Sequence, residues 1–278
     1  MNIPGKFMRS GKVKDIYSLS DGDLLFHFTN RVSAFDVVLP SEIPRKGEVL
    51  CKLGNYLFET LGVPNHMVRL EGEDMMVVKK MDMIAVESII RGYLYGSLME
   101  RAKKGEAKLP VEAVLAAKLP EPLFDPTTKS DVKDEPITED EILDQKRATG
   151  EELEYMKRSS LQIYETLGKR AADAGFILAD IKLEFGRLGD GVLLGDSIGP
   201  DEFRMWPKAK YEPGRTQESY DKQPVRDWLI SVGYKEKLDK ARKGGVTTPV
   251  PPRLPEWLVE ETSQRYLAVY KALSGKAL

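Results

Sequence analysis

Asp180, Lys182 and Glu184 stand two residues apart in a β-prone run, Phe176–Phe185, and Asp196 follows the next such run. Side chains alternate between the two faces of a strand, so the three charged residues share one face and the apolar residues between them face the core. Carboxylates gathered on one face suit a divalent cation that is bound together with phosphates. We interpret this cluster as the chemical centre of the chain; a strand with one solvated face is the alternative.

A Gly-Asp-Gly run at residues 189–191 predicts a hairpin back to a second strand, Val192–Leu194. If its loop has three residues, Glu184 lies opposite Asp196. Two carboxylates directly opposite each other are destabilising unless a cation lies between them. The expected pairing therefore favours a cation site over a solvated face.

The scarcity of cysteine and histidine narrows the kind of cation. Cys51 is the only cysteine, and His27 and His66 are the only histidines, which excludes a structural zinc site. Neither histidine lies near a nucleophile motif, so we interpret both as structural. A catalytic metal must then be held by oxygen ligands, which points to Mg²⁺ or Mn²⁺.

The composition indicates a globular enzyme rather than a nucleic-acid or membrane protein. The chain has 278 residues, 41% hydrophobic and 31% charged, with a net charge of −2, so one large domain or two tightly joined domains are expected. No basic excess favours a nucleic-acid partner. No apolar run approaches the ~20 residues of a membrane span, and no signal peptide begins the chain. With a single cysteine, these features predict a cytoplasmic protein.

The order of the predicted elements indicates a mixed α/β or α+β fold. Residues 12–29 read as a β-hairpin, and residues 105–150 as the longest irregular region, suited to a mobile loop. Thr149 and Glu152 form a capping-box pattern that begins a helix, which Gly175 ends. Further strands are expected at 75–80 and 84–91, and further helices at 49–61, 94–104, 225–241 and 257–274.

Two segments in the first third suit a nucleotide. The Walker A pattern is absent, but Lys12 and Lys14 alternate on a strand that leads into the hairpin, where lysines can cover phosphates. The alternative is a surface hairpin with solvated lysines. Val77–Asp82 resembles a strand that leaves one lobe for another and exposes backbone groups to an adenine; an ordinary connection is the alternative.

Arg91 and Ser97 are grouped around two glycines. An arginine fork binds a phosphate or carboxylate at two points, and Gly92 and Gly96 would let a ligand approach the backbone. A charged strand end is the alternative.

Basic residues also follow the acidic strands. Arg204 is a candidate clamp for an anionic group near the metal, and Lys222 and Arg226 are candidates further along the chain. For Lys222 and Arg226 the alternative is a helix start with solvated charges.

Taken in chain order, these segments resemble the SAICAR synthetases (phosphoribosylaminoimidazole-succinocarboxamide synthases) of purine biosynthesis, over about Gly11 to Trp228. The segments that carry the resemblance are GKVKDIY, TNRVSAFDVVLPSEIPRKG, VVKKMDMIAVESIIRGYLYGS, FDPTTKSD, LADIKLEFG, LGDSIGPDEFRMW and SYDKQPVRDWL. Any one of them alone would be a weak signal, but seven in order are not coincidence.

The resemblance implies two α/β lobes similar to ATP-grasp enzymes, an N-terminal one over 1–82 that covers the nucleotide and a C-terminal one over 83–278. It implies an ATP- and Mg²⁺-dependent ligase that joins carboxyaminoimidazole ribonucleotide (CAIR) to L-aspartate through an acyl phosphate and releases SAICAR, ADP and phosphate. Monomer and homo-oligomer both stay open.

The family's motifs also imply roles for individual residues. Asp180 and Lys182 would face the reacting centre, and Glu184 and Asp196 would bind the metal. The nucleotide would contact Lys12, Lys14, Lys80, Met81, Asp82 and Lys129, and the other substrates would contact Ser33, Asp36, Arg91, Ser97, Arg204, Lys222 and Arg226. Lys133 departs from the family, which often has histidine there.

Two other functions compete with this one. Inositol polyphosphate kinases are distantly similar in fold and carry an Asp-x-Lys strand, but the segments around Arg91 and Arg204 match the synthetases. A nucleotide-sensing module would not need both Glu184 and Asp196.

Overall fold

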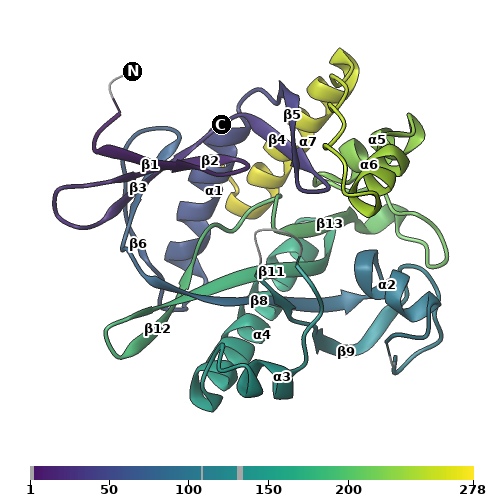
Figure 1. Ribbon diagram of the computed structural model, residues 1–278, viewed down its shortest axis with the longest axis horizontal. Coiled ribbons are helices and arrows are strands. Elements are labelled where there is room, and N and C mark those ends of the chain that lie inside the picture. The colour runs from purple at the N-terminus through teal and green to yellow at the C-terminus, as the bar shows by residue number, and fades with distance from the viewer. Residues whose placement is uncertain (1–2, 108, 130–133) are drawn as a thin grey trace. The chain divides into compact units, whose positions relative to one another are not determined.

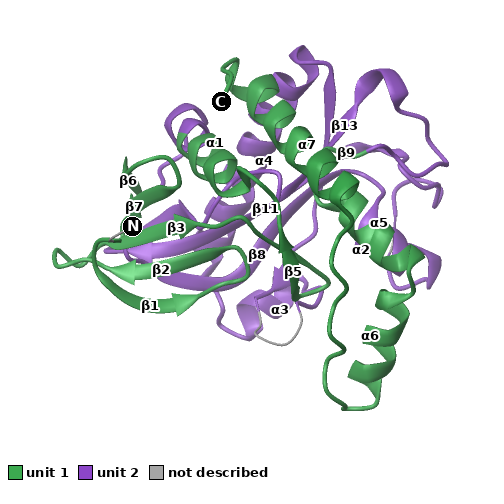
Figure 2. Ribbon diagram, turned by 90° about the horizontal axis from the view of Figure 1, so that it is seen from above, with its two compact units in different colours: residues 1–55, 67–79, 219–278 green, residues 56–66, 80–218 purple. Residues whose placement is uncertain are grey.

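The computed structural model describes residues 3–107, 109–129 and 134–278. Helices and strands alternate along the chain, which confirms the mixed α/β expectation (Figure 1). The chain divides into two compact units, each assembled from segments far apart in the sequence (Figure 2). Unit 1 comprises Met1–Asn55, Met67–Lys79 and Ser219–Leu278, and unit 2 comprises Tyr56–His66 and Lys80–Glu218.

Unit 1 contains a five-stranded antiparallel sheet. Its strands are β1 (Lys6–Ser10), β2 (Lys14–Ser18), β3 (Leu24–Phe28), β6 (Met67–Leu70) and β7 (Met75–Val78), in the order β1-β2-β3-β7-β6. The predicted hairpin is confirmed, since β2 pairs with β3 and the chain turns at residues 19–23. β1, which the sequence did not predict, is an exposed edge strand.

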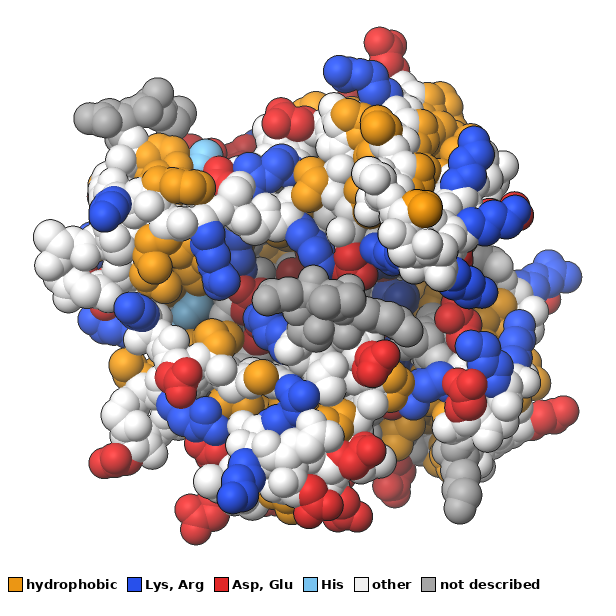
Figure 3. Space-filling view, in the orientation of Figure 1, with side chains coloured by type: hydrophobic (Ala, Val, Ile, Leu, Met, Phe, Trp, Pro, Cys, Tyr) orange, Lys and Arg blue, Asp and Glu red, His pale blue; other side chains and the backbone are white. Residues whose placement is uncertain are grey.

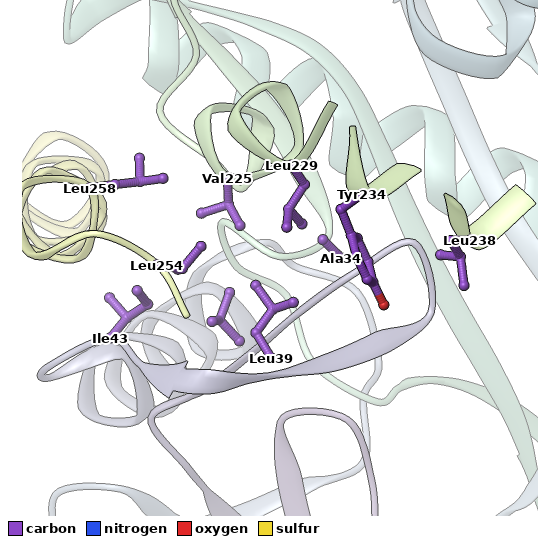
Figure 4. Packing of buried hydrophobic residues seen from close by; sticks show 10 residues of the cluster. Ala34, Leu39, Ile43, Val225, Leu229, Tyr234, Leu238, Leu254 and Leu258 are labelled. Atoms are coloured by element: carbon purple, nitrogen blue, oxygen red, sulfur yellow. The ribbon is translucent and has the colours of Figure 1, made fainter. Parts of the chain in front are cut away.

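The rest of unit 1 is held together by an apolar cluster (Figure 4). This remaining part of unit 1 contains β4 (Arg31–Ala34), β5 (Val37–Glu42), the first part of α1 (Lys46–Thr60), α5 (Gln223–Ser231), α6 (Tyr234–Lys243) and α7 (Glu256–Ser274). Ten buried residues form the cluster: Val32, Ala34, Leu39, Ile43, Val225, Leu229, Tyr234, Leu238, Leu254 and Leu258. Each fully buried aliphatic side chain contributes roughly 1.5–3 kcal/mol, so the C-terminal helices are firmly attached to β4 and β5.

The single helix expected over residues 225–241 is in fact two. Gly233 adopts a left-handed conformation (φ 74°) and separates α5 from α6. Glycine takes this conformation without the steric penalty of a Cβ atom. The break lets Leu229 and Leu238 both reach the same cluster.

The two units differ from the expected lobes, which met at one boundary after residue 82. Residues 219–278 group with the N-terminal strands, and residues 56–66 group with the central part of the chain. Helical periodicity shows that a helix has an apolar face but not which distant element covers it. The partners of the C-terminal helices therefore could not be predicted.

Unit 2 is built on a six-stranded antiparallel sheet. Its strands are β8 (Asp82–Tyr93), β9 (Lys118–Phe124), β10 (Thr127–Thr128), β11 (Phe176–Leu188), β12 (Gly191–Gly195) and β13 (Phe203–Pro207). The path runs β10-β8-β11-β12, with β9 also on β8 and β13 also on β11. The central strands β8 and β11 therefore have neighbouring strands on both edges. The sheet thus fixes the side chains that these two strands carry.

The helices of unit 2 are α2 (Gly96–Lys103), α3 (Glu139–Asp144), α4 (Gly150–Asp173) and the short 3₁₀ helix η1 (Lys208–Lys210). α4 begins at the predicted capping box, in which Thr149 and Glu152 exchange backbone and side-chain hydrogen bonds. It packs against β8 and β11. The expectation of an irregular region over residues 105–150 was wrong in part, because that region holds β9, β10 and α3.

Neither the charges seen on one face nor the helices of the described residues show an unusual feature. On the face shown in Figure 3, basic and acidic side chains are interspersed, in keeping with the net charge of −2. In the parts of the chain that the structure describes, no helix has both the length and the apolar character needed to cross a membrane.

Candidate active site

β11 has the predicted alternation of side chains. Its inward residues Ala179, Ile181, Leu183 and Phe185 are at most 1% exposed. On the opposite face Asp180 and Glu184 are also buried, each 5% exposed. A buried carboxylate is tolerated only when it is paired, so the alternative of a solvated face is wrong and the partners of these acids become informative.

The hairpin after β11 has a shorter loop than expected. Leu188 pairs with Gly191, which leaves two loop residues and places Glu184 opposite Gly195 rather than Asp196. Gly189 has a positive φ (58°) at the first loop position, which is where a type II′ turn requires glycine. The assumption of a three-residue loop was therefore wrong, and Asp196 is the first residue beyond the strand.

The carboxylate that does lie opposite Glu184 is Glu87 of β8. Lys182 Nζ lies between them, 3.0 Å from Glu87 Oε1 and 2.7 Å from Glu184 Oε1. Lys129 donates to the other oxygen of Glu184, and Thr127 Oγ1 donates to Glu87 Oε2 at 2.9 Å. The expected pair of opposed carboxylates with a cation between them thus exists, with Glu87 in place of Asp196 and an ammonium as the cation.

Sequence reasoning missed Glu87, although one signal was present. Glu87 and Arg91 are four residues apart on one strand, so they point to the same face. Once Arg91 is a site candidate, Glu87 should be one as well.

Negative charge is concentrated around Lys182. Burial alone would lower the pKa of its ammonium, but the carboxylates of Glu184, Glu87, Asp196 and Glu202 raise that pKa well above its usual value. Burial raises the pKa of the Glu87 carboxyl, an effect that Lys182 opposes. Four carboxylates thus act on Lys182, and Lys129 also pairs with Glu184. Carboxylates gathered in this way suit a cation bound together with phosphates.

The donor set fits Mg²⁺ bound jointly with phosphates. Among the described residues no group of three His, Cys, Asp or Glu side chains forms a complete metal site. Mg²⁺ commonly takes one or two carboxylates and completes its shell with water and substrate phosphates. Glu184 and Asp196 would supply such a pair of oxygen donors. Lys129, which donates to Glu184 Oε2, is 41% exposed.

A second cluster, of arginines, lies toward the N-terminal end of the same strand face. Arg204 Nη1 donates to Asp180 Oδ2 at 2.5 Å, and Arg91 Nη1 lies 3.8 Å from the same oxygen. Arg91 Nη2 donates to Ser97 Oγ at 2.9 Å, and Arg91 Nε donates to Asp125. The structure therefore brings Asp180 together with Arg91, Ser97 and Arg204. The resemblance assigns those last three residues to substrate contacts, but it groups Asp180 with Lys182.

At the two glycines near Arg91, side chains of the protein itself pack against the backbone. A Cβ atom at Gly92 would lie 1.8 Å from the hydroxyl of Tyr164, so this space is filled and the expected approach of a ligand there was wrong. A Cβ atom at Gly96 would lie 3.1 Å from Arg204 Nη2. The guanidinium of Arg204 also lies over the ring of Tyr95, 5.6 Å from its centroid, a favourable cation–π distance.

Four of the residues predicted to contact the nucleotide or the other substrates lie in the N-terminal part of unit 1, and a fifth, Lys80, lies just before β8. Lys12 forms an ion pair with Asp36. Lys14 is buried, with its ammonium 4.7 Å from the ring centroid of Phe26. Ser33 is buried on β4. Lys80 is exposed just before β8.

Met81 and Asp82 lie beside the hairpin of β11 and β12. Cβ atoms at Gly186 and Gly195 would lie 2.8 Å and 2.6 Å from the Met81 side chain, so Met81 covers two neighbouring glycines. Asp82 is exposed and forms an ion pair with Arg187 at 3.5 Å.

The last two substrate candidates lie at the start of α5. Lys222 is its N-cap residue. Arg226, in its first turn, donates from Nη1 to Gln223 Oε1 at 3.3 Å. Lys133, the departure from the family pattern, lies outside the described residues.

Comparison with known sequences gives consistent relatives over the whole chain. The phosphoribosylaminoimidazole-succinocarboxamide synthase of Nitrosopumilus maritimus is 48% identical over 275 residues, which are 98% of this chain and 100% of that protein. The enzyme of the same name from Candida maltosa is 36% identical, over 99% of this chain and 97% of that protein.

Solved structures that resemble this chain are also SAICAR synthases. The SAICAR synthase of Saccharomyces cerevisiae complexed with SAICAR has a TM-score of 0.82 and 32% identity, covering 98% of this chain and 95% of that one. A SAICAR synthetase in complex with ADP has a TM-score of 0.74 and 25% identity, over 97% of this chain and 98% of that one. The sequence profile of the SAICAR synthetases matches residues 7–241. The chain therefore belongs to the SAICAR synthetase family.

Proposed function

We propose that this chain joins the 4-carboxylate of CAIR to the amine of L-aspartate and consumes ATP, giving SAICAR, ADP and phosphate. One observation carries the proposal: a single face of β11 has an arginine cluster at Asp180 and a carboxylate–lysine cluster at Glu184. The two positions are four residues apart along the strand, which is about 13 Å. One substrate can thus bind its anionic end at the arginines and place its reacting end beside the cation site.

The chemistry follows from the weakness of a carboxylate as an electrophile. An oxygen of the CAIR carboxylate attacks the γ-phosphorus of ATP, and the bond from that phosphorus to ADP breaks. The aspartate amine then attacks the carbonyl carbon of the acyl phosphate, phosphate leaves, and the nitrogen loses a proton. The protein supplies orientation and charge neutralisation for both steps.

The residues of β11 and its neighbours divide these tasks. Glu184 and Asp196 would hold Mg²⁺, which neutralises phosphate charge when it is bound. Lys129 would exchange its partner Glu184 for an ATP phosphate. Lys182 would face the reacting groups, kept charged by the surrounding carboxylates. Asp180, which the family's motifs also assign to the reacting centre, would instead orient Arg204 and Arg91 at the anionic end of the substrate.

The family resemblance also implies contacts with the nucleotide and with the remaining substrate groups. Lys12 and Lys14 would cover the phosphates, and the Lys80–Asp82 segment would read the adenine. Ser33 and Asp36 would complete the substrate site, and so would Lys222 and Arg226 of α5. We place the reaction in the cytoplasm, a compartment suited to a protein whose only cysteine, Cys51, is free and buried.

The direct test measures ADP release from purified protein while substrates are omitted one at a time. We expect ADP only when CAIR, L-aspartate, ATP and Mg²⁺ are all present, because the acyl phosphate must be trapped by the amine for turnover. ADP formation with an inositol phosphate and no aspartate would instead support a kinase. ATP binding without turnover under every condition would support a nucleotide sensor.

Arg204→Ala should raise the KM for CAIR by about 10- to 100-fold, as expected for the loss of a charged hydrogen bond worth roughly 1.5–3 kcal/mol. The KM values for ATP and aspartate should change little. Arg170→Ala is a matched control, since that arginine binds Thr60 on another part of unit 2. An unchanged KM for CAIR in Arg204→Ala would remove Arg204 from the site.

A further inference from the structure

Residues 63–66 form a short segment, here called the brace, that lies along the outer edge of β12. Asn65 and Leu194 form a parallel bridge. The amide of His66 donates to the carbonyl of Leu194 at 3.0 Å, and the amide of Leu194 donates to the carbonyl of Pro64 at 3.0 Å. The brace therefore fixes both backbone polar groups of Leu194, two residues before Asp196.

The brace is itself anchored to the C-terminal end of α1. Asn65 Nδ2 donates to the carbonyls of Phe58 (2.9 Å) and Val63 (3.1 Å). The ring of His66 packs edge-on against Phe58 with 5.5 Å between centroids. His66 is only 2% exposed, so its ring has a fixed place rather than a choice of rotamers.

The His66 ring reaches the backbone of Asp196. Nε2 of His66 lies 3.1 Å from the carbonyl oxygen of Asp196. A carbonyl oxygen only accepts, so Nε2 carries the proton and donates it. Asp196 is the first residue beyond the ladder with β11, which ends at the pair Glu184 and Gly195. This contact holds the Asp196 carbonyl just beyond the end of the ladder between β11 and β12.

Asp196 needs such support because its backbone is in the left-handed region, with φ 56°. That conformation is sterically unfavourable for a residue other than glycine, and it occurs where the chain leaves β12. Its carboxylate is among those that act electrostatically on Lys182. A relaxed backbone at this residue would direct the carboxylate elsewhere.

We propose that His66 is a positioning residue that sets the direction of the Asp196 carboxylate toward the cation site by holding the Asp196 carbonyl. This inference rests on the proposed role of Asp196 as a metal ligand. It assigns His66 a task beyond packing, although His66 touches neither substrate nor metal. The sequence indicated only a structural histidine in a Pro-Asn-His turn.

Three substitutions separate the hydrogen bond from the volume of the ring. His66→Gln keeps an N–H donor at nearly the distance of Nε2, whereas His66→Met has similar bulk and no donor. His66→Asn keeps an amide but is one bond too short to reach the carbonyl. All three lose the ring contact with Phe58, so thermal unfolding of each reports the shared structural loss.

The readout is the affinity for Mn²⁺ in the presence of ADP, measured by electron paramagnetic resonance of free Mn²⁺. We expect His66→Met and His66→Asn to bind Mn²⁺ about 10-fold more weakly or worse, the range seen when outer partners of metal ligands are lost. His66→Gln should stay within about threefold of the parent protein. The turnover number should follow the Mn²⁺ affinity, while the KM for CAIR stays constant.

Two results would overturn the inference. If His66→Met and His66→Asn bind Mn²⁺ as the parent does, the histidine only packs. If His66→Gln is as defective as His66→Met, the hydrogen bond is not the cause. Asp196→Asn in the same titration separates this failure from that of the proposed function: unchanged Mn²⁺ affinity in that variant would reject Asp196 as a ligand altogether.

Discussion

Replacing Glu184 with glutamine, or Asp196 with asparagine, should lower the turnover number at least ~100-fold, as expected when a metal ligand at a phosphoryl-transfer site is lost. Each change keeps the shape of the side chain and removes one negative charge. Glu184 is 5% exposed and paired with Lys182 and Lys129, so its neutral form also weakens these two ion pairs. Steady-state ADP release at saturating substrates measures the effect.

Glu152→Gln provides the control for this prediction. Glu152 is a partly buried carboxylate of the same unit. It pairs with Arg187 and accepts a hydrogen bond from the backbone amide of Thr149, the N-cap residue of α4. Glutamine also serves at this position of a capping box, so the change mainly weakens the ion pair with Arg187. Stability should fall by at most ~1 kcal/mol, with turnover near the parent value. Near-normal turnover in both Glu184→Gln and Asp196→Asn would reject the metal assignment.

Gly92→Ala should destabilise the protein by about 3 kcal/mol or more, because an added Cβ atom overpacks the core and disrupts a buried hydrogen bond. The new atom would lie 1.8 Å from the Tyr164 hydroxyl, which donates to the carbonyl of Leu178 at 2.9 Å. Tyr164 must move, and with it the contact between α4 and β11. Urea unfolding at equilibrium measures the loss.

Gly168→Ala on α4 is the matched control, since nothing lies within 4 Å of its added Cβ atom. In a helix interior this change should stabilise by about 0.5–1 kcal/mol. Tyr164→Phe removes the hydroxyl, the atom nearest to the new methyl group, so the double variant with Gly92→Ala should lose less stability than the sum of the two single changes. A Gly92→Ala protein as stable as the parent would contradict this packing.

The functional strand could be predicted because its information is local. Alternation of charged and apolar residues over Asp180–Phe185 specifies which side chains share a face, and the structure follows it. The capping box at Thr149 and Glu152 likewise placed the start of α4 within one residue. Seven motifs in order then identified the family.

The register between strands could not be predicted, because it depends on one residue of loop length. A three-residue loop would have paired Glu184 with Asp196, and the two-residue loop pairs it with Gly195. On the other edge of β11, Glu184 pairs with Glu87 of β8, a strand from a much earlier part of the chain. The register between β8 and β11 also shifts between Glu184 and Gly186. Periodicity within one segment contains no information on such pairings.

The sequence also did not show what packs against Gly92 and Gly96. Gly92 and Gly96 were expected to leave room for a ligand, but they leave room for Tyr164 and Arg204. A glycine indicates that something comes close to the backbone; only the packing shows what it is. The assembly of unit 1 from distant segments, with α5–α7 packed on β4 and β5, likewise depends on long-range packing.

The most direct test of the central claim, that Glu184 and Asp196 together hold the catalytic cation, is a Mn²⁺ titration with ADP present. The parent protein, Glu184→Gln, Asp196→Asn and the control Glu152→Gln would be compared by electron paramagnetic resonance. We predict one Mn²⁺ site in the parent and in the control, and affinity reduced at least ~10-fold in each of the other two. Equal Mn²⁺ affinity in all four proteins would contradict the claim.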